Sequence, residues 1–301
     1  MTKTVNGLRY GLFGAGPWAR LTQAPALDAH GGVEFVGVWA RREAAARELA
    51  ESYEVRAYWG EDGVDALLAD CDAAAFALPP DVQAPLAVRA AEAGRHLLLD
   101  KPVATTVEGA RAVADAVDRA GVASVVFCTL RFADETAAWV DEQSRHDGWF
   151  TAHAQWLGSL FAAGSESPYA ASPWRREKGG LWDVGPHVLS VLLPILGEVT
   201  EVTAAGGPDH TVHLVLRHAS GASATVTLTL SAPREATGAA VELAGARGRS
   251  RMPAWSDPVT ALRLAIDELG HSARTGARHA CDVRFGLRLT EILTEAERQL
   301  G

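Results

Sequence analysis

The sequence predicts an α/β protein in which a doubly wound parallel sheet is followed by a second α/β domain with an open, mostly antiparallel sheet. Over about the first 125 residues, short apolar strands alternate with helical segments, which is typical of a parallel sheet with helices on both faces. Beyond about residue 130, apolar and polar residues alternate with a period of two, as in antiparallel strands. We therefore expect domains at residues 1–125 and 126–301.

The first domain is expected to open with a strand, a tight turn at 14–19 and a helix that ends near His30. Later helices carry clear boundary signals, because Asp81 is a candidate N-cap and Gly94 and Gly121 are typical stop residues. The predicted strands are 8–13, 33–40, 73–78, 96–99 and 122–128, and the later helices are 43–52, 81–93 and 106–120. This alternation requires right-handed crossovers.

The second domain is expected to combine hairpins with flanking helices. We expect a helix at 134–144, a strand at 150–157, a loop rich in Gly, Ser and Pro at 158–173, and a helix at 183–196. Later strands alternate, with Val212, Leu214 and Leu216 on one face and threonines on the other face of the next strand. Such a polar face is either solvated or packed against a partner subunit. Helices at 258–269 and 283–300 close the chain, and the last can pack back on the first domain.

Composition excludes several classes of protein. The net charge is −9 and the cations are not clustered, which argues against a nucleic-acid-binding surface. No uninterrupted apolar stretch reaches the length of a membrane span, and the first residues lack a signal-peptide core. Cys71, Cys128 and Cys281 are odd in number and far apart, so they fit a reducing cytoplasm rather than a disulfide framework. We expect a cytoplasmic protein with a small-molecule substrate.

The turn at 14–19 has the pattern of a dinucleotide-binding loop. In this pattern Gly14 permits the tight turn, Gly16 lets the backbone approach the pyrophosphate, and Ala19 lets the helix pack on the strand. Pro17 and Trp18 complete the loop. Because the loop follows a strand and opens a helix, we assign these residues to the cofactor. A tight strand–helix turn without a ligand is the alternative.

The end of the second strand bears on the choice of dinucleotide. An acidic residue usually reads the ribose there, but this strand ends in Ala40-Arg41-Arg42. Arginine binds phosphate well, so Arg41 and Arg42 favour NADP over NAD, with NAD still possible. Two solvated arginines at the start of a helix are the alternative.

Two further segments follow buried strands at the same expected edge of the sheet. Leu78 ends the predicted strand at 73–78 and Pro79 follows it, and we assign both residues to the cofactor. Lys101 lies within the run HLLLDKPVAT at 96–105, directly after the predicted strand and Asp100, which places a cation at the carboxyl end of a strand. Ligands bind at this edge of open parallel sheets, so a lysine beside a cofactor loop indicates redox chemistry.

A second motif, GGLWDVGPH, lies at 179–187 in the second domain. Asp183 and His187 are four residues apart and would share one face of a helix. A carboxylate there can orient the imidazole and raise its basicity. Three readings stay open: a catalytic pair, a helix cap beside a core histidine, or a metal pair, for which no third ligand has convincing spacing.

Taken together, these residues resemble the glucose–fructose oxidoreductase / inositol dehydrogenase (Gfo/Idh/MocA) family. The matching segments cover most of the chain and lie at 11–19, 34–42, 77–104, 172–175 (SPWR), 179–197 and 245–248. The resemblance implies a Rossmann domain, a second domain whose sheet often forms dimers, and NAD(P)-dependent hydride transfer to or from a polyol, sugar or related hydroxy compound. It also implies that His187 takes the hydroxyl proton, that Lys101 hydrogen-bonds the substrate oxygen and the cofactor, and that Asp183 places the substrate or the histidine.

The sequence departs from the family pattern around the expected pocket. Asp100 replaces a usual Glu, Gln83 stands where a His is frequent, and Thr129 and Ser190 replace Asn and Asp. These changes concern the substrate class more than the fold. The alternatives to a dehydrogenase are a non-catalytic cofactor-binding regulator and a lyase or hydrolase that uses transient hydride transfer. Retention of the three family residues favours the enzyme, which we expect to form a homodimer or a dimer of dimers.

Overall fold

The computed structural model describes residues 7–255 and 257–301 and divides into two compact units. Unit 1 consists of the described residues up to Phe132 together with Asp257–Leu287. Unit 2 consists of residues 133–255 together with Arg288–Gly301. This division differs from the expected domain ranges 1–125 and 126–301, because the segment 257–287 packs with the first part of the chain. Residues 1–6 of the expected first domain lie outside the described residues.

Unit 1 is built on a parallel sheet, sheet A, with six strands in the order β3-β2-β1-β4-β5-β6. The strands are β1 (Arg9–Phe13), β2 (Glu34–Ala40), β3 (Arg56–Trp59), β4 (Ala73–Phe76), β5 (His96–Asp100) and β6 (Ser124–Phe127). The order reverses between β1 and β4, which is the switch point where ligands bind in such sheets. The predicted parallel sheet is confirmed, but β3 and the helix after it were not predicted.

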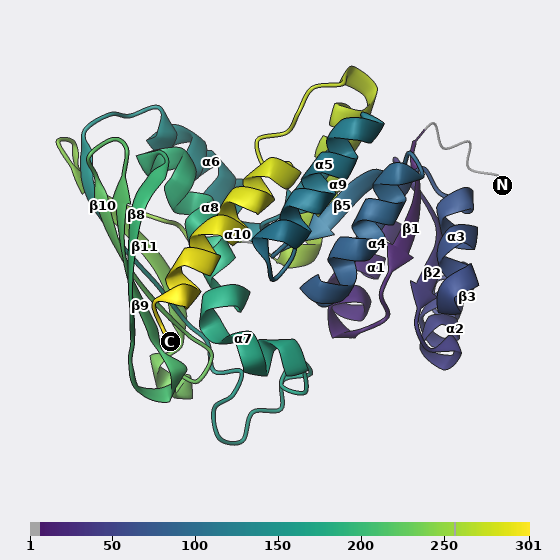
Figure 1. Ribbon diagram of the computed structural model, residues 1–301, viewed down its shortest axis with the longest axis horizontal. Coiled ribbons are helices and arrows are strands. Elements are labelled where there is room, and N and C mark those ends of the chain that lie inside the picture. The colour runs from purple at the N-terminus through teal and green to yellow at the C-terminus, as the bar shows by residue number, and fades with distance from the viewer. Residues whose placement is uncertain (1–6, 256) are drawn as a thin grey trace. The chain divides into compact units, whose positions relative to one another are not determined.

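Helix α5 of unit 1 has a capping residue at each end, whereas α2, α3 and α4 begin without a side-chain cap. The side chain of Thr106 accepts a hydrogen bond from the Gly109 N–H at the start of α5, and Gly121 ends this helix with φ 66°. The helical elements are η1 (Ala19–Gln23), α1 (Ala24–Asp28), α2 (Glu43–Glu51), α3 (Gly60–Asp70), α4 (Pro80–Glu92), α5 (Val107–Ala120), η2 (Thr129–Arg131) and α9 (Pro258–Thr275). Figure 1 labels most of them around sheet A.

Helix α9 belongs to unit 1 because its apolar stripe is buried there. Leu262, Ile266 and Leu269 are almost completely buried, and the helix packs against β5, β6 and α1. The side chain of Asp257 caps it by accepting hydrogen bonds from the N–H groups of Val259 and Thr260. The return of the chain to sheet A is therefore driven by burial of this stripe.

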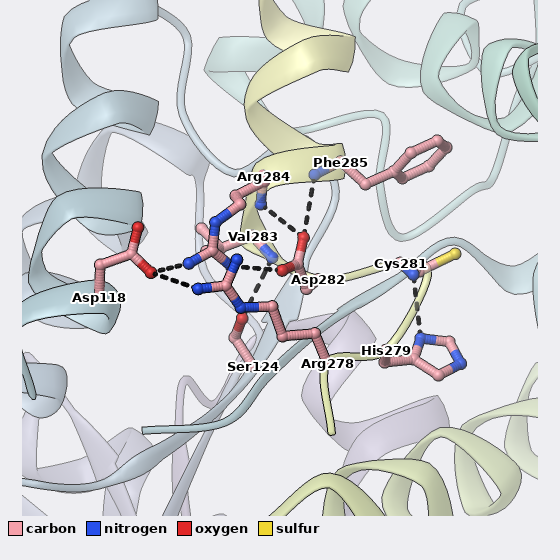
Figure 2. A network of polar contacts seen from close by, with 9 residues as sticks. All are labelled: Asp118, Ser124, Arg278, His279, Cys281, Asp282, Val283, Arg284 and Phe285. Atoms are coloured by element: carbon pink, nitrogen blue, oxygen red, sulfur yellow. Dashed lines mark hydrogen bonds and ion pairs between the residues drawn. The ribbon is translucent and has the colours of Figure 1, made fainter. Parts of the chain in front are cut away.

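A polar network holds the next segment, 276–287, on unit 1 (Figure 2). The guanidinium groups of Arg278 and Arg284 both pair with the carboxylate of Asp118, which lies on α5. Asp282 accepts hydrogen bonds from the N–H groups of Arg284 and Phe285, and so caps the start of α10 (Val283–Arg298). These ion pairs join the segment 276–287 to α5 of unit 1.

Unit 2 is built on a mixed sheet, sheet B, in the order β12-β11-β7-β10-β9-β8. Its strands are β7 (Trp149–Leu157), β8 (Val199–Gly206), β9 (Val212–His218), β10 (Ser223–Thr229), β11 (Gly238–Gly245) and β12 (Gly248–Arg251). β7 and β10 run parallel and all other pairs are antiparallel, which confirms the expected mostly antiparallel sheet. In β9, Leu214 is buried and Val215 is 44% exposed, so one face is covered and the other is open.

Helices lie on one face of sheet B, as Figure 1 shows for α6 (Asp134–Ser144) and α8 (Gly185–Leu196). Short η3 (Pro208–His210) and η4 (Arg234–Ala236) lie in connections between strands. The predicted helix at 183–196 is two elements, because α7 (Pro173–Asp183) ends at Asp183 before α8 begins. Among the described residues, one helical run, Pro173–Leu196, is long and apolar enough to cross a membrane, but 89% of its apolar window is buried. It has the burial of a core helix.

Candidate active site

In unit 1, the loop after β1 has the geometry that a dinucleotide requires. Gly14 has φ 129°, and a Cβ there would lie 2.3 Å from the carbonyl oxygen of Ala77, so no other residue fits. A Cβ on Gly16 would meet no heavy atom within 4 Å. The protein itself therefore does not demand glycine at 16, whereas close approach of a pyrophosphate would. Trp18 adds a buried Nε1–H without a hydrogen-bond partner among the described residues.

The two arginines after β2 lie at the same edge of sheet A. Arg41 and Arg42 are exposed, and Arg42 stands at the N-cap position of α2. Within the described part of the chain, neither forms an ion pair, and Ala40 before them is buried. A cofactor with an additional phosphate would find two available guanidinium groups here and no carboxylate at the usual position of the ribose reader.

Lys101 follows β5 in a turn whose backbone is held by the side chain of Gln83. This role of Gln83 was not predicted from the sequence. Gln83 of α4 is fully buried. Its Nε2 donates to the carbonyl oxygens of Asp100 (2.9 Å), Pro102 (3.2 Å) and Val103 (3.1 Å), and its Oε1 accepts from the Asp100 N–H (2.9 Å). The Lys101–Pro102 peptide within this turn is cis. A buried amide thus sets the backbone on both sides of Lys101.

The cofactor loop, Leu78-Pro79 and Lys101 follow β1, β4 and β5, which are neighbours in sheet A. Because parallel strands end at one edge, the sheet brings these three predicted segments to the same side of unit 1. Pro79 is also the N-cap residue of α4, so Leu78 and Pro79 form the short link from strand to helix.

In unit 2, Asp183 and His187 lie at the junction of two helices. Asp183 is the last residue of α7, and His187 is in the first turn of α8, after an interruption at Val184. Both side chains are largely buried. Asp183 Oδ2 is paired with Nε of Arg175 at 3.1 Å. The predicted spacing is realised, and the carboxylate has a cationic partner that the sequence did not predict.

Two indole rings follow one another from the imidazole of His187. The ring of Trp156, on β7, stacks on it with a centroid distance of 4.8 Å and an interplanar angle of 21°. Trp255 lies next to Trp156 at 5.4 Å. Both indoles are partly exposed, so they offer an apolar wall beside a titratable group. Such a wall suits the C–H face of a ring-shaped substrate.

Thiol chemistry has no support in this structure. Cys71, Cys128 and Cys281 are free and completely buried. Burial raises the pKa of Cys71 and Cys281 to about 11, and it raises the pKa of Cys128 further. Thiols in such surroundings stay protonated and inert, so the three cysteines serve as small buried residues of the core. Over residues 7–255 and 257–301, no cluster of three or more potential metal ligands is present.

The family follows from two matches, one in each unit. The model of an oxidoreductase family with an NAD-binding Rossmann fold, GFO/IDH/MocA, matches residues 8–127, and the GFO/IDH/MocA C-terminal domain matches residues 150–251. This chain belongs to the GFO/IDH/MocA family. The resemblance read from the sequence is thereby confirmed.

Curated members of the GFO/IDH/MocA family act on sugars by name. The chain is 30% identical over 226 residues to dTDP-3,4-didehydro-2,6-dideoxy-alpha-D-glucose 3-reductase of Streptomyces violaceoruber, covering 72% of this chain and 60% of that protein. It is 28% identical over 134 residues to levoglucosan dehydrogenase of Pseudarthrobacter phenanthrenivorans, covering 43% and 34%. The alignments therefore span less than two thirds of the length of these relatives.

Solved structures agree with the fold over nearly the whole chain. GenD2 from gentamicin A biosynthesis, in complex with NAD, superposes with a TM-score of 0.83 at 19% identity, covering 98% of this chain and 94% of that one. Levoglucosan dehydrogenase, in complex with NADH and levoglucosan, gives a TM-score of 0.81 at 18% identity, covering 98% and 97%. At these identities the likeness establishes the fold of this GFO/IDH/MocA member and no more.

Proposed function

We propose that this protein is an NAD(P)-dependent oxidoreductase that transfers hydride between a nicotinamide cofactor and a hydroxyl-bearing carbon of a sugar or related polyol. One observation carries the proposal: the glycine loop, Leu78-Pro79 and Lys101 follow three neighbouring parallel strands and share one edge of sheet A. A phosphate-binding loop and a cation at that edge are what a nicotinamide dehydrogenase requires.

The roles of the three family residues follow from their chemistry. In oxidation, His187 accepts the hydroxyl proton, and Lys101 donates a hydrogen bond to the oxygen as it becomes a carbonyl. Asp183, as an ionised acceptor, orients a substrate hydroxyl. A nicotinamide dinucleotide held by the loop at 14–19 would supply the acceptor for the hydride. In reduction the same groups act in reverse, with His187 returning the proton.

A sugar ring is the substrate class that we favour. The names of three similar proteins specify a reaction at position 3 of a sugar. These proteins are the dTDP-3,4-didehydro-2,6-dideoxy-alpha-D-glucose 3-reductase described above, D-glucoside 3-dehydrogenase of Escherichia coli and UDP-N-acetylglucosamine 3-dehydrogenase of Acidithiobacillus ferrooxidans. The partly exposed indole of Trp156, which stacks on His187, and that of Trp255 next to it support the same class, because aromatic rings pack on the C–H face of sugars. A ring hydroxyl at a position like C3 would be the reacting group.

The choice of NADP belongs to this proposal. Arg41 and Arg42 are exposed and Ala40 stands in place of an acid, which supports binding of a 2′-phosphate. We also propose a homodimer or dimer of dimers formed through the open face of sheet B, where Val215 is exposed. The three free, buried cysteines fit a reducing compartment such as the cytoplasm.

The test begins with the purified protein and no added cofactor. Mass spectrometry identifies any dinucleotide that co-purifies, and a panel of sugars, glycosides and polyols is then followed by nicotinamide absorbance. The oxidation rate should rise with pH over the range in which imidazoles titrate, and His187→Ala should remove this rise and cost roughly 10²–10⁴-fold. Dinucleotide binding without turnover on any substrate would favour a regulatory role. An unchanged pH profile with a lower melting temperature would make His187 structural.

A further inference from the structure

Arg175, the last residue of the SPWR segment, forms a shielded ion pair with Asp183. Its Nε lies 3.1 Å from Oδ2 of the carboxylate, and the two side chains are only 18% and 12% exposed. An ion pair with so little solvent around it is screened much less than a surface pair. The proposed function alone does not account for this cation.

The guanidinium of Arg175 is held from several sides. It lies over the ring of Trp174 at 4.7 Å and over the ring of Tyr169 at 5.2 Å, both measured to the ring centroid. Its Nη1 also lies 3.5 Å from the Ser172 hydroxyl, at the limit of a hydrogen bond. Two aromatic contacts restrict a planar guanidinium far more than they would restrict a lysine ammonium.

The chain path also favours this pair. In a straight helix, the eight steps from residue 175 to residue 183 would separate the two Cα atoms by about 12 Å along the axis. Gly179, with φ 64° and ψ −160°, interrupts α7 between them. The interruption redirects the chain, and a residue with a Cβ would adopt this conformation only with strain. The sequence thus supplies both the cation and the break.

We propose that Arg175 is a positioning residue, which fixes the Asp183 carboxylate in its ionised form and in one orientation for contact with a substrate hydroxyl. This inference rests on the proposed function, in which Asp183 orients the substrate. Arg175 acts only through Asp183. Without the guanidinium, a largely buried carboxylate favours its protonated form and turns more freely, so it ceases to be a fixed acceptor.

The kinetic test uses full-length variants and a matched control. Arg175→Met should lower kcat/KM by roughly 10- to 100-fold, equivalent to one charge-assisted hydrogen bond, and Arg175→Lys should recover part of this loss. Arg176→Met is the control, because Arg176 also stacks on an aromatic ring, that of Phe161, and forms no ion pair among the described residues. The control should stay within about threefold of the wild type.

A double-mutant cycle separates positioning from a structural role. In an Asp183→Asn background, Arg175→Met should cost little further activity, because its target is already gone. Equal losses in both backgrounds, or equal effects of Arg175→Met and Arg176→Met, would overturn the inference. The affinity for the dinucleotide should be the same in all these variants, because the substitutions leave the loop at 14–19 intact. A reduced affinity would indicate damage to that loop.

A second measurement does not need turnover. In NMR spectra, the carboxyl ¹³C signal of Asp183, assigned by its loss in Asp183→Asn, reports the ionisation of this carboxyl group. The other charged or titratable residues of this region are left unchanged in all variants, so that only the Arg175 charge differs: Arg176, Glu177, Lys178, His187 and Glu297. The signal should titrate at a higher pH in Arg175→Met than in the wild type. Identical titrations would refute the anchoring of Asp183 even if the wild type showed no activity, whereas inactivity with a shifted titration would count against the proposed function alone.

Discussion

The Gln83 amide offers a quantitative test of how the lysine turn is held. This side chain is fully buried, and four hydrogen bonds join it to the backbone of Asp100, Pro102 and Val103. Gln83→Leu keeps nearly the same volume and removes all four. Since the side chain has only two N–H groups for three carbonyl oxygens, about three bonds of ordinary strength are lost.

The expected cost follows from what is left behind. The Asp100 N–H loses the Gln83 Oε1 acceptor, which costs about 1–3 kcal/mol. The three carbonyl oxygens also lose the two N–H groups that they share, so the total cost is about 3 kcal/mol. In a unit of this size, this corresponds to a fall of about 6–12 °C in melting temperature. The turn would also hold Lys101 less firmly, so turnover should decrease further than the loss of folded protein explains.

Gln23→Leu is the matched control. Gln23 is as buried as Gln83, but its Nε2 donates one hydrogen bond, to the Phe76 carbonyl oxygen at 2.6 Å, and its Oε1 is buried with no partner among the described residues. Replacing it should cost less than about 1 kcal/mol, because an unsatisfied oxygen is removed together with one bond. Urea and thermal unfolding of both variants measure the difference. Losses that agree within about 1 kcal/mol would refute the hydrogen-bond account.

Three other outcomes are expected. Lys101→Ala should keep folding and dinucleotide affinity while turnover falls roughly 10²–10³-fold, as measured by steady-state kinetics; near-wild-type turnover would remove Lys101 from the mechanism. Fluorescence titration should give about tenfold or more preference for NADPH over NADH, reversed by Ala40→Asp with Arg41→Ser, and a wild-type preference for NADH would contradict the role of the arginines. Burial lowers the pKa of His96, His218 and His279, so these histidines stay neutral in the folded protein but take up protons below about pH 6.5 in the unfolded chain. The free energy of unfolding should therefore decrease as the pH drops from about 7.5 to about 5.5. Equal melting temperatures at the two pH values would contradict this expectation.

The parts of the fold that could be predicted were those with a strong local signal. Buried runs such as 96–99 and the alternating strand at 212–218 have the period and composition of strands, and both are strands in the structure. β3 is only four residues long, and its arginine and aromatic residues lack a clear alternation, so it was not predicted. The place of α9 could not be predicted either. Its apolar stripe shows that it packs against something, but not which unit it covers.

The same limit applies to the candidate site. Lys101, Asp183 and His187 lie in compact motifs, and the glycine loop has a fixed spacing, so local pattern was enough to nominate them. Gln83 acts on residues 17 to 20 positions away, and Trp156 is 31 positions from the histidine on which it stacks. Neither contact could be predicted from the local sequence pattern. The roles of the nominated residues stay predictions until the variants are measured.

The return of α9 to the first sheet has a consequence for the order of events during synthesis. Residues 257–287 leave the ribosome after all of unit 2 except its last segment, yet they cover β5 and β6. The nascent first half therefore waits with an apolar sheet surface uncovered while more than a hundred residues are added, in contrast to chains whose domains fold one after another. A fragment that ends at Phe132 would keep that surface bare permanently, and we expect it to require a chaperone or to aggregate.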